Sequence, residues 1–180
     1  MNLKNIAIAF FVLATFTYTG CNKIKEALDV TFNTSFSTNM NFDVPAASRD
    51  INEGGTFNQT ATIDMTTVTQ FNDYKDKLKS ATVKSITFTV TSISEEPVTL
   101  TDVEISIYYG DLAMPMYTIT SMEITNGSSF TLPEAQFDVV NQIILNAVGI
   151  TVGVSGSSSV APVQFTYKTE IDAEIVANPL

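Results

Sequence analysis

Hydrophobic and polar residues alternate strictly in two long stretches of the chain. From Leu28 to Val44 every even-numbered position is apolar or threonine, and every odd-numbered position between them is polar. The same alternation returns from Val163 to Ile175. A period of two predicts strands with one buried face and one solvated face, a pattern typical of antiparallel sheets.

Shorter alternations between these stretches predict five more strands. They lie around residues 57–65, 86–90, 98–109, 116–124 and 150–154. The alternation slips by one position at Lys84-Ser85, which predicts a β-bulge. In the strand at 98–109, four residues are expected to face the core: Val103, Ile105, Ile107 and Tyr109.

Two segments have the period of a helix instead. Between Thr67 and Lys79 apolar residues recur every three or four positions, and the basic residues near the end of this segment suit a helix C-terminus. The second segment starts at Pro133 and stops before Gly149, which are the residues expected at a helix start and just past a helix end. We therefore predict a mainly β fold: a single antiparallel β-sandwich domain over residues 28–177, with about seven strands and two short amphipathic helices.

The first twenty residues have the composition of an export signal. Lys4 gives a short positive start, and an apolar run extends from Ile6 to Phe16. Eleven helical residues rise only ~16 Å, about half of a ~30 Å hydrocarbon core. Residues 1–20 are therefore predicted to be a cleaved signal peptide rather than a membrane span.

The residues Tyr18-Thr19-Gly20-Cys21 resemble the lipobox of bacterial lipoproteins, which usually has leucine where this chain has Tyr18. The resemblance covers about the first 21 residues and says nothing about the rest of the chain. It implies that the Cys21 thiol carries diacylglycerol, that the leader is removed before Cys21, and that the new amino group is acylated. Two or more acyl chains are needed to hold a protein stably in a membrane. The alternative is an ordinary secretory signal followed by an unmodified cysteine.

Residues 21–27 form the predicted lipid-anchored tether. Seven steps from Cys21 to Leu28 span at most ~25 Å, so the domain is expected to sit close to the bilayer. Asn22 stands where aspartate marks inner-membrane retention in some lipoproteins, and this likeness implies the outer membrane. The residues after Cys21 resemble acidic surface-export signals poorly, which leaves both the periplasmic and the cell-surface face open.

Composition and charge narrow the chemistry that is expected. The chain has no histidine, one cysteine and a net charge of −10. Histidine-dependent triads, histidine-ligated zinc and thiol–imidazole pairs are excluded. The negative charge would repel a phosphate backbone, so nucleic acid is not an expected partner.

Two groups of residues are candidates for ligand binding. The carboxylates Asp102 and Glu104 share a strand face with Tyr108, and such a set could clasp a sugar; the alternative is a tyrosine that covers the sheet rim. Asp50 and Asn52 resemble the opening of a calcium loop, but Ala61 occupies the position where an EF-hand needs glutamate. A polar hairpin loop is the favoured interpretation of that segment.

Two further groups contain residue types that occur in catalytic sites. The carboxylates Glu170, Asp172 and Glu174 are ~7 Å apart along one strand face, a spacing that overlaps that of inverting glycosidases. A solvated polar face is favoured, because nothing apolar lies among them to raise a pKa. Ser157–Ser159 could form a serine–lysine dyad with Lys168, although no motif supports it. No catalytic residue is predicted.

The sequence therefore favours a non-enzymatic, outer-membrane-anchored envelope lipoprotein that acts as a scaffold or as an assembly and interaction domain. The alternative is a glycan- or calcium-dependent ligand-binding module of the cell envelope. Expected partners are the membrane, through the lipid on Cys21, and an envelope protein or polysaccharide. No cofactor is expected apart from that covalent lipid.

Overall fold

A computed structural model describes residues 28–45 and 54–179. These ranges contain eight strands: β1 Val30–Val44, β2 Gly55–Asp64, β3 Leu78–Ile93, β4 Val98–Tyr109, β5 Leu112–Ile124, β6 Ser129–Thr131, β7 Gly149–Ser158 and β8 Val163–Ala177. The helices are α2 Thr69–Tyr74 and α3 Phe137–Asn146, and short 3₁₀ turns lie at η1 Met65–Thr67, η2 Lys75–Lys77 and η3 Glu134–Gln136.

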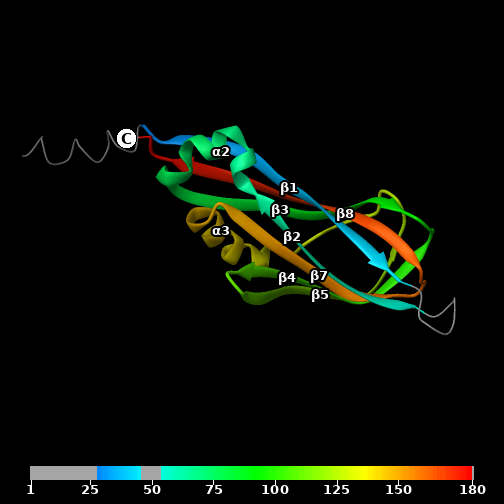
Figure 1. The fold of residues 1–180 in the computed structure, drawn as a ribbon. Coiled ribbons are helices and arrows are strands. Elements are labelled where there is room, and N and C mark those ends of the chain that lie inside the picture. Colours follow the sequence, from blue (N-terminus) through cyan, green and yellow to red (C-terminus); the bar gives the residue numbers. More distant parts are fainter. Residues whose placement is uncertain (1–27, 46–53, 180) are drawn as a thin grey trace, which may run out of the picture.

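The strands form two four-stranded antiparallel sheets that pack face to face (Figure 1). Sheet A has the order β1-β8-β3-β6, and sheet B has the order β2-β7-β4-β5. Strands pair from the two ends of the chain inward, β1 with β8, β2 with β7, β3 with β6 and β4 with β5. This nested pairing gives the strand order of an eight-stranded jelly roll. The predicted mainly β sandwich is confirmed.

The two long alternating stretches form the paired strands β1 and β8, as predicted. Their register holds from Val30 opposite Ala177 to Val44 opposite Val163. Phe36 and Ile171, which lie opposite each other, are both buried, whereas their polar neighbours along each strand face outward. Alternation of this length specifies the register, because a slip of one residue would turn every core side chain to solvent.

The irregularity predicted at Lys84-Ser85 is confirmed, because the pairing of β3 with β8 shifts between Val83 and Ser85. At this bulge the backbone N–H of Val83 donates to Asn141 Oδ1 of α3 at 2.7 Å. A side chain of the helix thus satisfies a backbone donor beside the break in the ladder. Strand β6 was not predicted, since three residues are too few to show a period.

The prediction that Tyr109 faces inward is wrong. Its side chain is 59% exposed, although Val103, Ile105 and Ile107 of the same strand are buried as expected. Tyr109 is the last residue of β4, next to the turn at Gly110. It lies beyond the edge of the core, so its phase along the strand no longer decides its burial.

The helices are shorter than predicted. α2 ends at Tyr74, and Leu78 and Lys79 already belong to β3, where Leu78 pairs with Ala177. α3 ends at Asn146, and Gly149 begins β7 instead of capping the helix. In the described ranges, neither helix has the length and hydrophobicity needed to cross a membrane.

Aromatic side chains fill the centre of the sandwich. Phe42 stacks on Phe165 with ring centroids 4.6 Å apart, and it meets Tyr167 edge-on at 5.7 Å. Tyr167 is 1% exposed. Its hydroxyl and that of the neighbouring inward residue Thr169 have no hydrogen-bond partner among the described residues. Both hydroxyls are therefore buried at a cost in stability.

Candidate functional site

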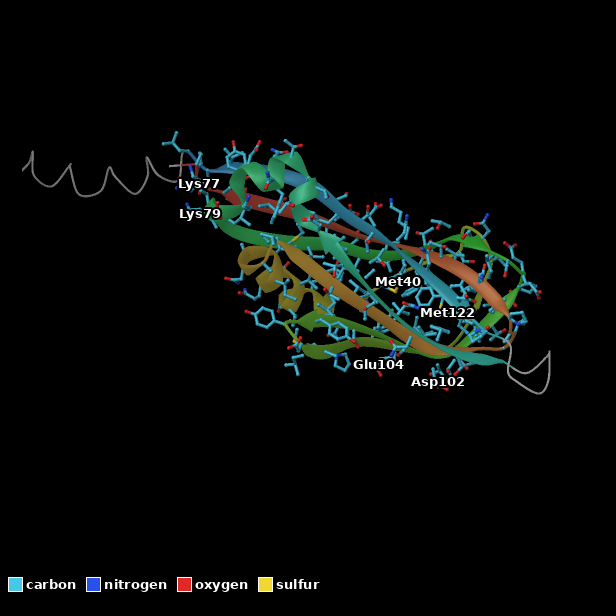
Figure 2. The ribbon with its side chains drawn as sticks, in the orientation of Figure 1. Met40, Lys77, Lys79, Asp102, Glu104 and Met122 are labelled. Atoms are coloured by element: carbon cyan, nitrogen blue, oxygen red, sulfur yellow. The ribbon has the colours of Figure 1, made fainter. Side chains whose placement is uncertain are left out.

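The candidate ligand-binding residues lie on β4, in the middle of sheet B. Glu104 pairs with Ser155 and Tyr108 with Thr151, which puts both on the outer face of the sheet. Asp102 is exposed, has a φ of 50°, and lies where the β4–β7 register shifts between Thr101 and Glu104. Figure 2 shows Asp102 and Glu104 toward the end of the molecule opposite Lys77 and Lys79.

Tyr108 covers the backbone of the neighbouring strand. A Cβ atom on Gly153 would lie only 2.8 Å from the Cε2 atom of the Tyr108 ring. The ring therefore occupies the space that a side chain on β7 would otherwise fill, in the way aromatic residues cover strand glycines. This close contact accounts for the half-buried state of Tyr108.

The three candidates share one face but do not converge on one point. Glu104 and Tyr108 are four residues apart on one strand, or ~13 Å. The Glu104 carboxylate accepts a hydrogen bond from the Ser106 hydroxyl at 3.2 Å. A ligand that touched all three candidates would have to be extended along β4, as an oligosaccharide is. Binding by these residues stays a prediction.

The other predicted site residues lie outside the described residues. These are the calcium candidates Asp50 and Asn52, the lipidation candidate Cys21, the signal peptide 1–20 and the tether 21–27. Within residues 28–45 and 54–179, no group of three or more carboxylate, cysteine or histidine side chains is arranged to hold a metal.

The carboxylates of β8 lie on the outer face of sheet A and take part in cross-strand contacts. Asp172 accepts hydrogen bonds from Ser35 of β1 and from Ser85 of β3, the latter at 2.7 Å. Glu170 pairs with Lys168, and Glu174 pairs with Lys84. The three carboxylates therefore lie in a row along the outer face of the sheet, paired with residues of the neighbouring strands or of their own strand.

The serine–lysine pair considered above is not brought together. Ser158 is buried and its hydroxyl donates to the Val160 carbonyl at 2.8 Å, and Ser159 Oγ accepts from the Thr99 backbone N–H. Lys168, by contrast, pairs with Glu170 on the outer face of the other sheet. The two residue types are thus on opposite sides of the sandwich.

Two of the open depressions among the described residues lie at opposite ends of the sandwich. One has a volume of about 490 Å³ and is lined by both polar and apolar residues: Asn41, Phe42, Asp43, Ser92, Ile93, Ser94, Gln164, Phe165 and Thr166. The other, of about 720 Å³, is lined by η2 and the end of α3: Lys75, Asp76, Leu78, Leu145, Asn146, Ala147, Val148 and Gly149.

Sequence reasoning missed the surface around the second depression. The sequence places Lys75, Lys77 and Lys79 in the last turns of a predicted helix, whereas in the structure Lys75 and Lys77 belong to η2 and Lys79 to β3. Only the fold shows that they lie where the first and last strands meet. Lys79 forms an ion pair with Asp29, fifty residues away in sequence, with 2.7 Å between Lys79 Nζ and Asp29 Oδ2.

Comparisons with known proteins add no family. No protein-family description matches the chain, and no curated protein matches it. Among solved structures, the decameric BFDV capsid protein shares 7% identity at a TM-score of 0.43, covering 81% of this chain and 99% of its own. The protein of desmodium yellow mottle tymovirus shares 10% at 0.35, covering 84% and 90%. A Parabacteroides distasonis protein shares 12% at 0.32, covering 73% of this chain and 39% of its own. Likenesses this distant carry no argument about function.

Proposed function

We propose that the chain is an outer-membrane lipoprotein that holds a non-enzymatic β-sandwich close to the bilayer. In this proposal residues 1–20 are removed and acyl chains on Cys21 anchor the protein. The domain acts as a scaffold or as an assembly and interaction domain for envelope proteins or polymers.

The observation that carries the proposal is the short sequence distance between Cys21 and the first strand of the domain. Strand β1 begins at Val30 and is paired from its first residue. The segment between Cys21 and Leu28 can span at most ~25 Å. An anchor at Cys21 would therefore keep the sandwich at the membrane surface, which suits a domain that works by contact with neighbours there.

The two outer sheet faces support a role in contact rather than in enclosing a substrate. Sheet A presents hydroxyl, amide and paired carboxylate groups along β1, β8 and β3, such as Asn39, Asp172 and Thr87. Broad polar faces of this kind can bind proteins or polymers through many hydrogen bonds, whereas small-molecule sites are usually concave and mostly apolar.

Metabolic labelling with palmitate tests the anchor. We expect label on the wild-type chain and none on Cys21→Ser, which should also leave the membrane fraction. Asn22→Gln is the matched control, because it changes the adjacent residue but keeps the thiol. The proposal fails if the wild type carries no label and Cys21→Ser stays bound to membranes.

A glycan-binding module is the second candidate, favoured by the depression of about 490 Å³ at the end of β1. Its lining of amides, hydroxyls and Asp43 could form hydrogen bonds with sugar hydroxyls. A thermal-shift screen with oligosaccharides and with calcium separates the two candidates. A ligand at 100 times its dissociation constant adds ~2.7 kcal/mol, which raises the Tm of a domain of this size by roughly 5–10 °C. Absence of any shift favours the scaffold; a shift with one sugar favours the binding module.

A further inference from the structure

The two sheets have four edge strands, two on each side of the sandwich. β1 and β2 lie next to each other along one side (Figure 1), and β6 and β5 are the edges on the other side. An edge strand exposes backbone N–H and C=O groups that can pair with a further strand. Proteins protect such edges by short strands, proline, charged side chains, irregular pairing or a covering element. The four edges of this sandwich differ in that protection.

The edges formed by β5 and β6 are protected. β6 has only three residues, Ser129–Thr131, and so offers a very short edge. β5 contains Pro115, which has no backbone N–H to donate to a partner strand. The pairing of β5 with β4 is also irregular, with a register shift between Ile105 and Ser106. Neither strand is suited to pairing with another chain.

Strand β1 is covered along its first half. Phe32 and Phe36 of β1 contact Tyr74 and Phe71 of α2, with ring centroids 6.0 and 5.2 Å apart. In Figure 1 this helix lies over the first half of the strand. The second half ends in an exposed carboxylate, that of Asp43. Only part of the β1 edge is therefore open.

Strand β2 has none of these protections. It contains no proline, lysine or arginine, and its one carboxylate, that of Asp64, is at its very end. Its pairing with β7 runs without a shift from Gly55 to Asp64. Among the described residues, the backbone from Gly55 to Ile63 has no hydrogen bond to any element other than β7. The β2 edge is thus a regular, uninterrupted row of backbone groups open to a further strand.

The inner face of β2 is also uncovered at its centre. Phe57 and Ile63 are buried, but Gln59 between them is exposed and Ala61 is half-buried. Neither sheet A nor α2 therefore closes over the middle of the strand. Both the backbone and the central side chains of β2 are accessible to a partner.

The residues of β2 are complementary to those of a second, antiparallel β2. When Thr60 lies opposite the Thr60 of another copy, Phe57 lies opposite Ile63 and Thr56 lies opposite Asp64. The two apolar residues then meet on the inner face of the sheet, because this register keeps the inner side chains of both copies on one side. A hydroxyl donor meets the only carboxylate, and no like charges are opposed.

We propose that two copies of this chain join through β2 as a symmetric antiparallel pair, so that sheet B continues through both copies with four strands from each. The pairing of residues 56–64 forms roughly nine backbone hydrogen bonds, close to the ~10 of a typical interface. Both copies use the same edge, so the contact closes on itself and gives a dimer instead of a fibre. This pairing does not depend on the proposed anchor at Cys21.

A cysteine at the symmetry axis tests the pairing. Thr60 is exposed, and residues opposite each other in an antiparallel pair have Cα atoms ~4.5–5.5 Å apart, within the ~4.4–6.8 Å that a disulfide spans. Cells that express the full chain with Thr60→Cys are oxidised with copper phenanthroline, and the products are separated without reductant. We expect a disulfide-linked dimer. The wild type, whose only cysteine is Cys21, measures the background.

Two other single cysteines are the matched controls. Thr56 is also exposed and lies on the same strand, but in the proposed register it is eight residues, or ~27 Å, from the Thr56 of the other copy. Thr118 is exposed on the protected edge strand β5. Thr56→Cys and Thr118→Cys should therefore give no more dimer than the wild type.

A charge at the same position gives a second measurement. Thr60→Lys places two ammonium groups opposite each other at the symmetry axis, which should weaken the association on the order of tenfold or more. Thr118→Lys is the control and should leave the association unchanged. Analytical ultracentrifugation of the full chain in dodecyl maltoside measures the association, and circular dichroism checks that both variants keep the strand content of the wild type.

Four outcomes overturn the proposal. They are a wild-type chain that stays monomeric, a Thr60→Cys chain that forms no dimer, equal cross-linking of Thr56→Cys and Thr60→Cys, and a Thr60→Cys disulfide to a different protein. The first two show that the copies do not pair through β2, the third shows random collision, and the fourth shows another occupant of the edge. Palmitate labelling at Cys21 is independent of all four, so failure of the pairing and failure of the anchor are distinguishable.

Discussion

Removing the Tyr167 hydroxyl should stabilise the domain. The phenol is 1% exposed among aromatic rings, and its oxygen has no hydrogen-bond partner in the described part of the chain. A buried polar group without a partner costs ~1–3 kcal/mol. Tyr167→Phe removes that cost and loses only a few dispersion contacts of one oxygen atom, ~0.5 kcal/mol in all. We therefore expect a gain of about 1 kcal/mol in the free energy of unfolding.

Urea denaturation followed by circular dichroism measures this gain. Tyr117→Phe is the matched control: Tyr117 is 39% exposed, and its variant should change the free energy of unfolding by less than ~0.5 kcal/mol. If Tyr167→Phe instead destabilises the domain by 1 kcal/mol or more, the hydroxyl has a partner and the reasoning is refuted.

The same substitution has a pH signature. Burial raises the pKa of the Tyr167 phenol well above its ordinary value of 10.0. Since the folded state holds the proton more tightly than the unfolded chain, ionisation of this phenol leaves the free energy of unfolding of the wild type unchanged below pH 10 and lowers it as the pH rises above 10. The advantage of Tyr167→Phe over wild type should therefore be constant from pH 7 to pH 9 and grow above pH 10. A constant difference at all pH values would contradict the burial of the phenol.

Three further substitutions test the core and the sheet faces by urea denaturation. Thr169→Val should stabilise the domain by about 1 kcal/mol, because it removes the other buried hydroxyl without a described partner; a loss would reveal a partner. Phe36→Ala should destabilise it by ~3–5 kcal/mol, since the ring is 1% exposed and packs edge-on against Phe71 at 5.2 Å; a loss under 1 kcal/mol would contradict that packing. Asp172→Ala should lower the free energy of unfolding by ~1–2 kcal/mol, because the hydroxyls of two serines on the flanking strands lose their acceptor. An unchanged free energy of unfolding would show that water replaces the carboxylate fully as an acceptor.

The strands that could be predicted from the sequence are those with one face in the core and the other face in water. β1 and β8 alternate over fifteen residues because one face of each is buried in the sandwich and the other is solvated. The bulge near Lys84-Ser85 was visible for the same reason, as a break in that alternation. Element ends were less predictable: Leu78 fits the phase of the preceding helix, but its pairing with Ala177 places it in a strand.

Features set by long-range pairing could not be predicted. The row of partners around Asp172 requires the order β1-β8-β3, and alternation in single strands carries no information on strand order. The ion pair between Lys79 and Asp29 has the same origin, because the two residues meet only after β1 and β3 have both paired with β8. The contact of Tyr108 with Gly153 likewise follows from the pairing of β4 with β7.

The nesting of the strands sets the order in which the molecule can be completed. β1 lies at the edge of sheet A, and its backbone is hydrogen-bonded to β8, which begins at Val163. When synthesis or transport delivers the chain from its N-terminus, more than a hundred residues must follow β1 before β8 is available to pair with it. Long-range pairings of this kind form slowly. A chain threaded through a translocation channel would therefore be unable to complete sheet A until β8, its last strand, has passed.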